Sequence, residues 1–213
     1  MDYNTDSARK SLTREEAFGQ PLKNDPNLCI TSPQTFRYNC IAFAMGMDDR
    51  WVDSAPLPWH WWPLNVPKEQ SCAALKEAFA YLGFEDCGMD DTLDDDYDKV
   101  ALYQKDGFWT HAARVVGAGI YHSKFGSSYD GRHSNGDVLQ KQYGYVYAIM
   151  RRHKADSVLT EQRKGNAPGV IHLNKGVINI NGHCNHLVAY GGKTYLAESG
   201  REVCVSGSQL TIL

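Results

Sequence analysis

Two residues in this chain, Cys40 and His111, have the types and local contexts that thiol chemistry needs. Asn39 is a favourable helix N-cap and Gly46 a favourable C-cap, which predicts a short helix with Cys40 in its first turn. There the helix dipole would stabilise a thiolate. His111 opens an apolar run that is typical of a strand, and its imidazole could act as a base. If the two side chains meet, they form a nucleophile and its base.

A third group would orient the imidazole of His111. A tight turn at Gly117-Ala118-Gly119 would bring the segment after Phe125 beside His111, so that Asp130 or His133 could accept its second N–H. Asp130 is the preferred candidate, because a carboxylate also stabilises the imidazolium that forms during acyl transfer.

His186 is a rival to His111 as the base, because it also stands at the start of a predicted strand, with Glu198 in the next strand as its orienting group. His183 and Cys184 beside it could begin a metal site, but the pattern lacks a fourth ligand and zinc-finger spacing. The acidic stretch 90–98 does not follow the spacing of an EF-hand and is expected to be a solvated loop. We therefore expect neither a metal nor a cofactor.

Candidate substrate-binding residues lie in two places. Trp59, Trp61 and Trp62 belong to a proline-rich, irregular stretch that could form one wall of a cleft. Arg114 lies further along the strand of His111, and we expect it on the same face, where it could bind a substrate carboxylate through two parallel hydrogen bonds. The plainer interpretation is core packing for the tryptophans and a structural ion pair for the arginine.

The composition is that of an ordinary globular protein, with 22% charged and 42% hydrophobic residues among 213. A net charge of −3 argues against nucleic-acid or anionic-membrane partners. The polar, acidic N-terminus does not resemble a Sec signal peptide, and no segment reaches the ~18 apolar residues of a membrane span. We expect a cytoplasmic protein, or one secreted by a signal-peptide-independent route, with six reduced cysteines.

The hydrophobic pattern predicts an α+β chain with an N-terminal arm at 1–35, a catalytic domain at 36–153, a linker at 154–169 and a C-terminal β segment at 170–213. Apolar residues at helical spacing between Pro67 and Gly83 predict a helix over 67–82. Strands are predicted at 99–104, 110–116, 120–124, 143–151, 170–173, 177–180, 187–190, 193–197 and 203–205. Gly191-Gly192 predicts a hairpin between two of them.

Several sequence blocks together resemble a bacterial domain family of unknown function. These blocks occur in the same order over roughly residues 36–152, at 39–42, 61–63, 99–103, 110–114, 123–126, 130–133 and 143–146. The chain departs from the family at Phe43 and Tyr121, where tryptophan is expected. The order of Cys, His and Asp or His is similar to that of papain-like, NlpC-type peptidases. The resemblance implies a papain-like α+β fold, with the cysteine helix packed on an antiparallel sheet.

These features predict a cysteine hydrolase or acyltransferase that acts on an amide or peptide bond through a Cys40 thioester, with His111 as its base. Deamidation and transglutamination would use the same groups. The expected substrate is a protein, a peptide or peptidoglycan, and a role as a bacterial effector or toxin is suggested by analogy of fold alone. The alternative is a non-catalytic protein- or peptide-binding module in which Cys40 is a core thiol.

Overall fold

The computed structural model describes residues 25–134, 137–166, 171–180, 183–197, 199–206 and 209–213. Over these residues the fold is α+β, as predicted, with mostly antiparallel sheets and few helices. Most of the predicted N-terminal arm lies outside the described residues. No helix in the described residues is both long and apolar enough to cross a membrane.

A seven-stranded antiparallel sheet forms the framework of the first part of the chain. Across the sheet the strands are β1 (Cys29–Ile30), β8 (Asp130–Ser134), β7 (Ile120–Lys124), β6 (Phe108–Gly117), β5 (Tyr97–Lys105), β9 (Tyr145–His153) and β4 (Glu85–Asp86). The turn predicted at residues 117–119 joins β6 to β7, with Gly119 at φ 66°. The sequence did not predict a strand at β8, but this segment pairs with β7 along its whole length.

Helix α3 (Cys40–Met45) confirms the predicted caps. The Asn39 side chain accepts a hydrogen bond from the Ala42 N–H at 3.0 Å, and Gly46 takes the left-handed conformation that ends the helix. The amide of Asn39 also donates to the Val52 carbonyl at 2.8 Å, which fixes where the helix begins. Every residue of α3 is buried.

Helix α4 (Cys72–Tyr81) begins later than the predicted start at Pro67. Its N-cap is Ser71, whose hydroxyl accepts a hydrogen bond from the Ala74 N–H at 3.1 Å, so that the chain enters the helix only there. The predicted stop is confirmed, because Gly83 follows the helix with φ 88°.

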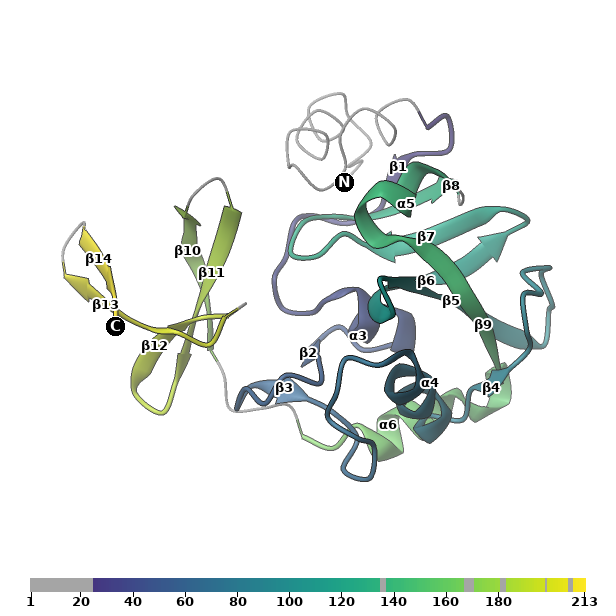
Figure 1. Ribbon diagram of the computed structural model, residues 1–213, viewed down its shortest axis with the longest axis horizontal. Coiled ribbons are helices and arrows are strands. Elements are labelled where there is room, and N and C mark those ends of the chain that lie inside the picture. Colours follow the sequence, from purple (N-terminus) through teal and green to yellow (C-terminus); the bar gives the residue numbers. More distant parts are fainter. Residues whose placement is uncertain (1–24, 135–136, 167–170, 181–182, 198, 207–208) are drawn as a thin grey trace.

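The two faces of the large sheet carry different helices (Figure 1). On one face, α3 and α4 pack over a core that includes Val100 and Leu102 of β5. The alternate residues Ala101 and Tyr103 belong to a separate core on the other face. Helix α5 (Asp137–Tyr143), which the sequence did not predict, covers that second core. Adjacent residues of one strand therefore enter different cores.

The predicted linker 154–169 contains regular structure. It forms the 3-10 helix η1 (Lys154–Ser157) and helix α6 (Val158–Arg163). Arg50, 1% exposed, donates hydrogen bonds of 2.6–3.3 Å to the carbonyls of residues 164–166, while Asp49 binds the same guanidinium at 2.7 Å. The chain that leaves α6 is thus held against the first part of the molecule.

The C-terminal residues form a five-stranded antiparallel meander. Its strands are β10 (Ile171–Ile180), β11 (His183–Tyr190), β12 (Lys193–Leu196), β13 (Glu202–Ser206) and β14 (Gln209–Ile212). The two strands predicted before residue 181 form a single strand with a register shift between His172 and Val177. The predicted turn at Gly191-Gly192 is confirmed, and both glycines have positive φ.

A short parallel pair, β2 (Trp51–Val52) and β3 (His60–Trp61), leads to this second sheet. Between the two strands, Trp59 packs against Val188 and Ala197 of the C-terminal segment. Its indole N–H donates to the Ala197 carbonyl at 3.3 Å. A residue from the first part of the chain therefore completes a small core of the second sheet.

Candidate functional site

Cys40 stands at the first position of α3, as predicted, but its thiol is buried against β6. The side chain is 9% exposed and packs in the same core as Ala112. Burial raises the pKa of Cys40 to about 11, although backbone N–H groups, first that of Ala112, act in the opposite direction. Cys40 is therefore a protonated core thiol at neutral pH.

His111 points to the opposite face of the sheet from Cys40. Its ring stacks on Tyr143 of α5 at 4.1 Å and contacts the ring of Tyr103 edge-on at 5.3 Å. Cys40 packs beside Ala112, the next residue on β6, whose side chain must leave the other face. The structure does not bring Cys40 and His111 together, which removes the geometric basis of the predicted pair.

His111 is instead joined to His133 through Ser123. The ring atom Nε2 of His111 lies 3.0 Å from Oγ of Ser123, and that oxygen lies 2.8 Å from Nε2 of His133. His133 donates its Nδ1–H to the Ser134 carbonyl at 2.7 Å, so in its neutral form Nε2 accepts from the serine. His111 then donates to Ser123, and its Nδ1 has no hydrogen-bond partner among the described residues.

This network is closed to solvent. His111, Ser123 and His133 are each 0% exposed, and burial is the main cause that lowers the pKa of both imidazoles. The sequence placed Ser123 in a recurrent block without giving it a role. The ladder between β6 and β7 pairs Arg114 with His122, so alternation along the two strands places Ser123 on the face of His111, although the ladder has a register shift between Val115 and Gly117 beside the turn.

Asp130 lies on the α3 face, away from His111. Its Oδ2 accepts a hydrogen bond from the Tyr38 hydroxyl at 2.6 Å, and its backbone N–H donates to the Ser32 hydroxyl at 2.9 Å. Burial raises the pKa of this carboxyl. Because Asp130 and His133 are an odd number of residues apart on β8, only one of them can share a face with His111. The predicted orienting contact from Asp130 is absent.

The three candidate tryptophans serve in packing. Trp59 is 2% exposed in the C-terminal core, and Trp62 stacks on Trp109 with its indole N–H bonded to the Pro67 carbonyl at 3.1 Å. Trp61 is half-buried beside the core of α3 and α4. The cavity described below has none of the three in its lining.

Arg114 is three residues after His111, so the expectation that they share a face was wrong. It points to the α3 face, where Nε and Nη2 donate to the Phe43 carbonyl at 2.9 and 2.5 Å. The guanidinium also lies over the Phe43 ring, 4.3 Å from its centroid. Helix α3 is thus fastened to β6 by an arginine, and no ion pair with Arg114 occurs among the described residues.

Arg114 lines a cavity of about 510 Å³ at the C-terminal end of α3. The cavity lies on the α3 face, among the ends of β5, β6 and β9, and the connection between β4 and β5 forms one side. Its charged lining residues are Asp94, Asp95, Asp98, Lys99, Arg114, Arg152 and Lys154, and its apolar lining includes Phe84, Leu93 and Val116. This volume falls within the range of small-ligand sites.

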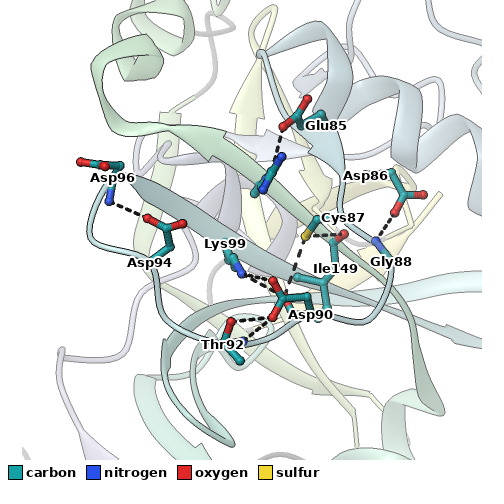
Figure 2. Close-up of polar contacts among 11 residues, drawn as sticks. Glu85, Asp86, Cys87, Gly88, Asp90, Thr92, Asp94, Asp96, Lys99 and Ile149 are labelled. Atoms are coloured by element: carbon teal, nitrogen blue, oxygen red, sulfur yellow. Dashed lines mark hydrogen bonds and ion pairs between the residues drawn. The ribbon is translucent and has the colours of Figure 1, made fainter.

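The acidic connection beside the cavity is held by specific contacts (Figure 2). Lys99 binds the Asp90 carboxylate at 2.7 Å, and this contact is the first cause that lowers the pKa of Asp90. Thr92 donates to the same carboxylate, and the Asp96 N–H donates to Asp94 at 2.9 Å. The stretch 90–98 was predicted to be a solvated loop; residues 90–96 are a loop with fixed anchors, and residues 97 and 98 begin β5.

The rival histidine, His186, is on β11, but its side chain and those of His183 and Cys184 lie outside the described residues, as does Glu198. Within the residues that are described, no three His, Cys, Asp or Glu side chains are grouped as a metal site.

The first part of the chain is an α+β domain with a closed polar network on one face and a charged cavity on the other. Residues 29–151 match the family model described as a domain of unknown function (DUF7689), and the chain belongs to this family. That range contains nearly all of the stretch predicted to resemble a family of unknown function. No curated protein and no solved structure matches the chain.

Proposed function

We propose that this chain is a non-catalytic binding module that holds a carboxylate of a peptide or protein partner in the cavity beside α3. The observation that carries the proposal is that the guanidinium of Arg114 faces the cavity with part of its hydrogen-bonding capacity unused. It lines the cavity, two of its nitrogens are occupied by the Phe43 carbonyl, and Nη1 has no acceptor among the described residues.

The surroundings of Arg114 suit this role. Its contacts with Phe43 fix the guanidinium before any ligand arrives, which lowers the entropic cost of binding. The side chain is partly buried, so burial lowers its pKa, and a charge-assisted hydrogen bond is stronger there than in water. The neutral ring of His122, whose pKa burial lowers to about 4, adds a polar group to the same lining.

The cysteine hydrolase with a papain-like arrangement, and with it a role as an effector or toxin, stays the alternative prediction. It receives less support from the geometry, because Cys40 is buried with a raised pKa and His111 belongs to the other face. For Cys40 to act, both the helix and the sheet would have to rearrange.

The test is a binding titration with N-acetyl-Ala-Ala, which has a free carboxylate, and with its C-terminal amide, which has none. We expect chemical-shift changes in β6 and at the end of α3 for the acid only. Arg114→Lys keeps the charge but removes the planar fork, and we expect it to weaken binding about 10-fold. Arg132→Lys, at an exposed arginine on β8, is the matched control.

Equal binding of the acid and the amide, or an unchanged affinity in Arg114→Lys, would refute the carboxylate role. Thermal unfolding of each variant, measured alongside, shows whether a loss of binding reflects only a loss of folded protein.

A further inference from the structure

The cavity beside α3 has walls of opposite charge. Arg114 and Arg152 enter it from strands β6 and β9, and Asp94 and Asp95 enter it from the connection between β4 and β5. The two kinds of group are only partly paired with one another, and those that are unpaired define the ligand that would fit.

On the basic side, Arg152 adds a second guanidinium to that of Arg114. Its side chain is 5% exposed and lies 4.4 Å from the centroid of the Phe84 ring. Nη1 donates to the Thr160 hydroxyl at 2.5 Å, and Nη2 lies 3.5 Å from the Asp98 carboxylate. The buried Nε has no hydrogen-bond partner among the described residues, so this guanidinium keeps a donor that Asp98 and Thr160 do not satisfy.

On the acidic side, Asp95 has an exposed carboxylate for which no partner occurs among the described residues. Lys154, which could have neutralised it, donates instead to the Asp95 backbone carbonyl at 2.6 Å and so holds the loop in place. The contacts of Asp90 and Asp94 shown in Figure 2 fix the same connection. The carboxylate of Asp95 is therefore presented from an anchored segment.

From these walls we infer that the ligand is a small zwitterion, such as a short peptide with both termini free, whose carboxylate meets Arg114 and whose ammonium group meets Asp95. This inference rests on the proposed function and adds a second charged group, the ammonium, to the carboxylate of the ligand. Acidic peptides and other polyanions are disfavoured, because each additional negative charge would face Asp94, Asp95 and Asp98. A volume of about 510 Å³ accommodates a ligand of dipeptide size.

The experiment compares three probes of matched size: Ala-Ala, N-acetyl-Ala-Ala and Ala-Ala amide. We expect the unblocked dipeptide to bind at least about 10-fold more tightly than either blocked form, by calorimetry or chemical-shift titration. Asp95→Asn should remove most of this advantage and leave the affinity for N-acetyl-Ala-Ala unchanged. Asp96→Asn makes the same charge change on the same connection at a residue outside the cavity lining, and should leave all three affinities unchanged.

Each failure has a separate meaning. If N-acetyl-Ala-Ala binds as tightly as Ala-Ala, the zwitterion inference falls and the carboxylate module stands. If none of the probes binds, both fall. If Asp96→Asn weakens Ala-Ala as much as Asp95→Asn does, the effect comes from the net charge of the loop, and the assignment of Asp95 is overturned.

Discussion

The two faces of the seven-stranded sheet treat their polar side chains in opposite ways. On the α5 face, His111, Ser123 and His133 bond to one another and are fully buried. On the α3 face, Arg114 lines a cavity with part of its guanidinium unused. Polar residues on the same or adjacent strands can therefore have different roles. Whether an even or an odd number of residues separates them along a strand determines which face, and so which role, each one takes.

Removal of the serine should have the largest effect. Ser123→Ala leaves two buried imidazole nitrogens without their common partner, and each unsatisfied buried group costs about 1–3 kcal/mol. We expect the free energy of unfolding, from urea denaturation at pH 8, to fall by about 2–5 kcal/mol. Ser127→Ala, at a nearby serine outside the network, should change it by less than about 0.5 kcal/mol. Equal effects would show that the network contributes no stability.

The reactivity of Cys40 tests whether the α3 face holds a nucleophile. A rise in pKa from 9.0 to about 11 reduces the thiolate fraction at neutral pH roughly 100-fold, and burial slows alkylation further. We expect iodoacetamide at pH 7.5 to label the exposed Cys204 at least about 100-fold faster than Cys40, as measured by peptide mass spectrometry. Faster labelling at Cys40 would instead revive the thiol hydrolase.

Replacement of Arg114 should lower the free energy of unfolding less than replacement of Ser123 does. Arg114→Gln removes two hydrogen bonds to the Phe43 carbonyl and a cation–π contact, and we expect a loss of about 2 kcal/mol in the free energy of unfolding. Arg132→Gln, at an exposed arginine, should cost less than about 0.5 kcal/mol. If both variants unfold alike, Arg114 does not fasten α3 to the sheet.

Acid should destabilise the protein through its buried histidines. Burial lowers the pKa of His111 and His133, and that of His122 from 6.5 to about 4. As the pH falls through about 6.5, the histidines of the unfolded chain take up protons while those of the folded protein stay neutral. The free energy of unfolding is therefore highest above pH 6.5 and falls below it. His122, with its pKa of about 4 in the folded state, should cost about 1 kcal/mol between pH 6.5 and 5.5. His122→Gln should flatten the pH dependence of urea unfolding by that amount, and an unchanged slope would contradict the assignment.

Local sequence signals were sufficient to predict those elements whose ends are set by caps or by glycine turns. Asn39 and Gly46 bound α3 as predicted, and the glycine turns at 117–119 and 191–192 gave both hairpins. The start of α4 was predicted less well, because Pro67 and Ser71 are both good starting residues and only the tertiary contacts of the chain select between them.

The site could not be predicted to the same degree, because it depends on which face each side chain takes. His111 pairs with Tyr103 in the regular part of the ladder between β5 and β6, so plain alternation places it on the face of Ala113 and opposite to Ala112. Which of these two faces α3 covers is decided by tertiary packing, for which the sequence carries no strong local signal. A cysteine and a histidine with suitable local contexts therefore came to lie on opposite sides of the sheet.

The position of β9 also determines when the molecule can be completed during synthesis. This strand lies between β5 and β4, yet it is the last strand of the large sheet to leave the ribosome. Until it emerges, β5 has an open edge and β4 has no partner strand. A nascent chain that stalls before residue 145 therefore exposes the edge of β5, a strand that is internal to the finished sheet, and such an open edge is the kind of surface that chaperones protect from aggregation.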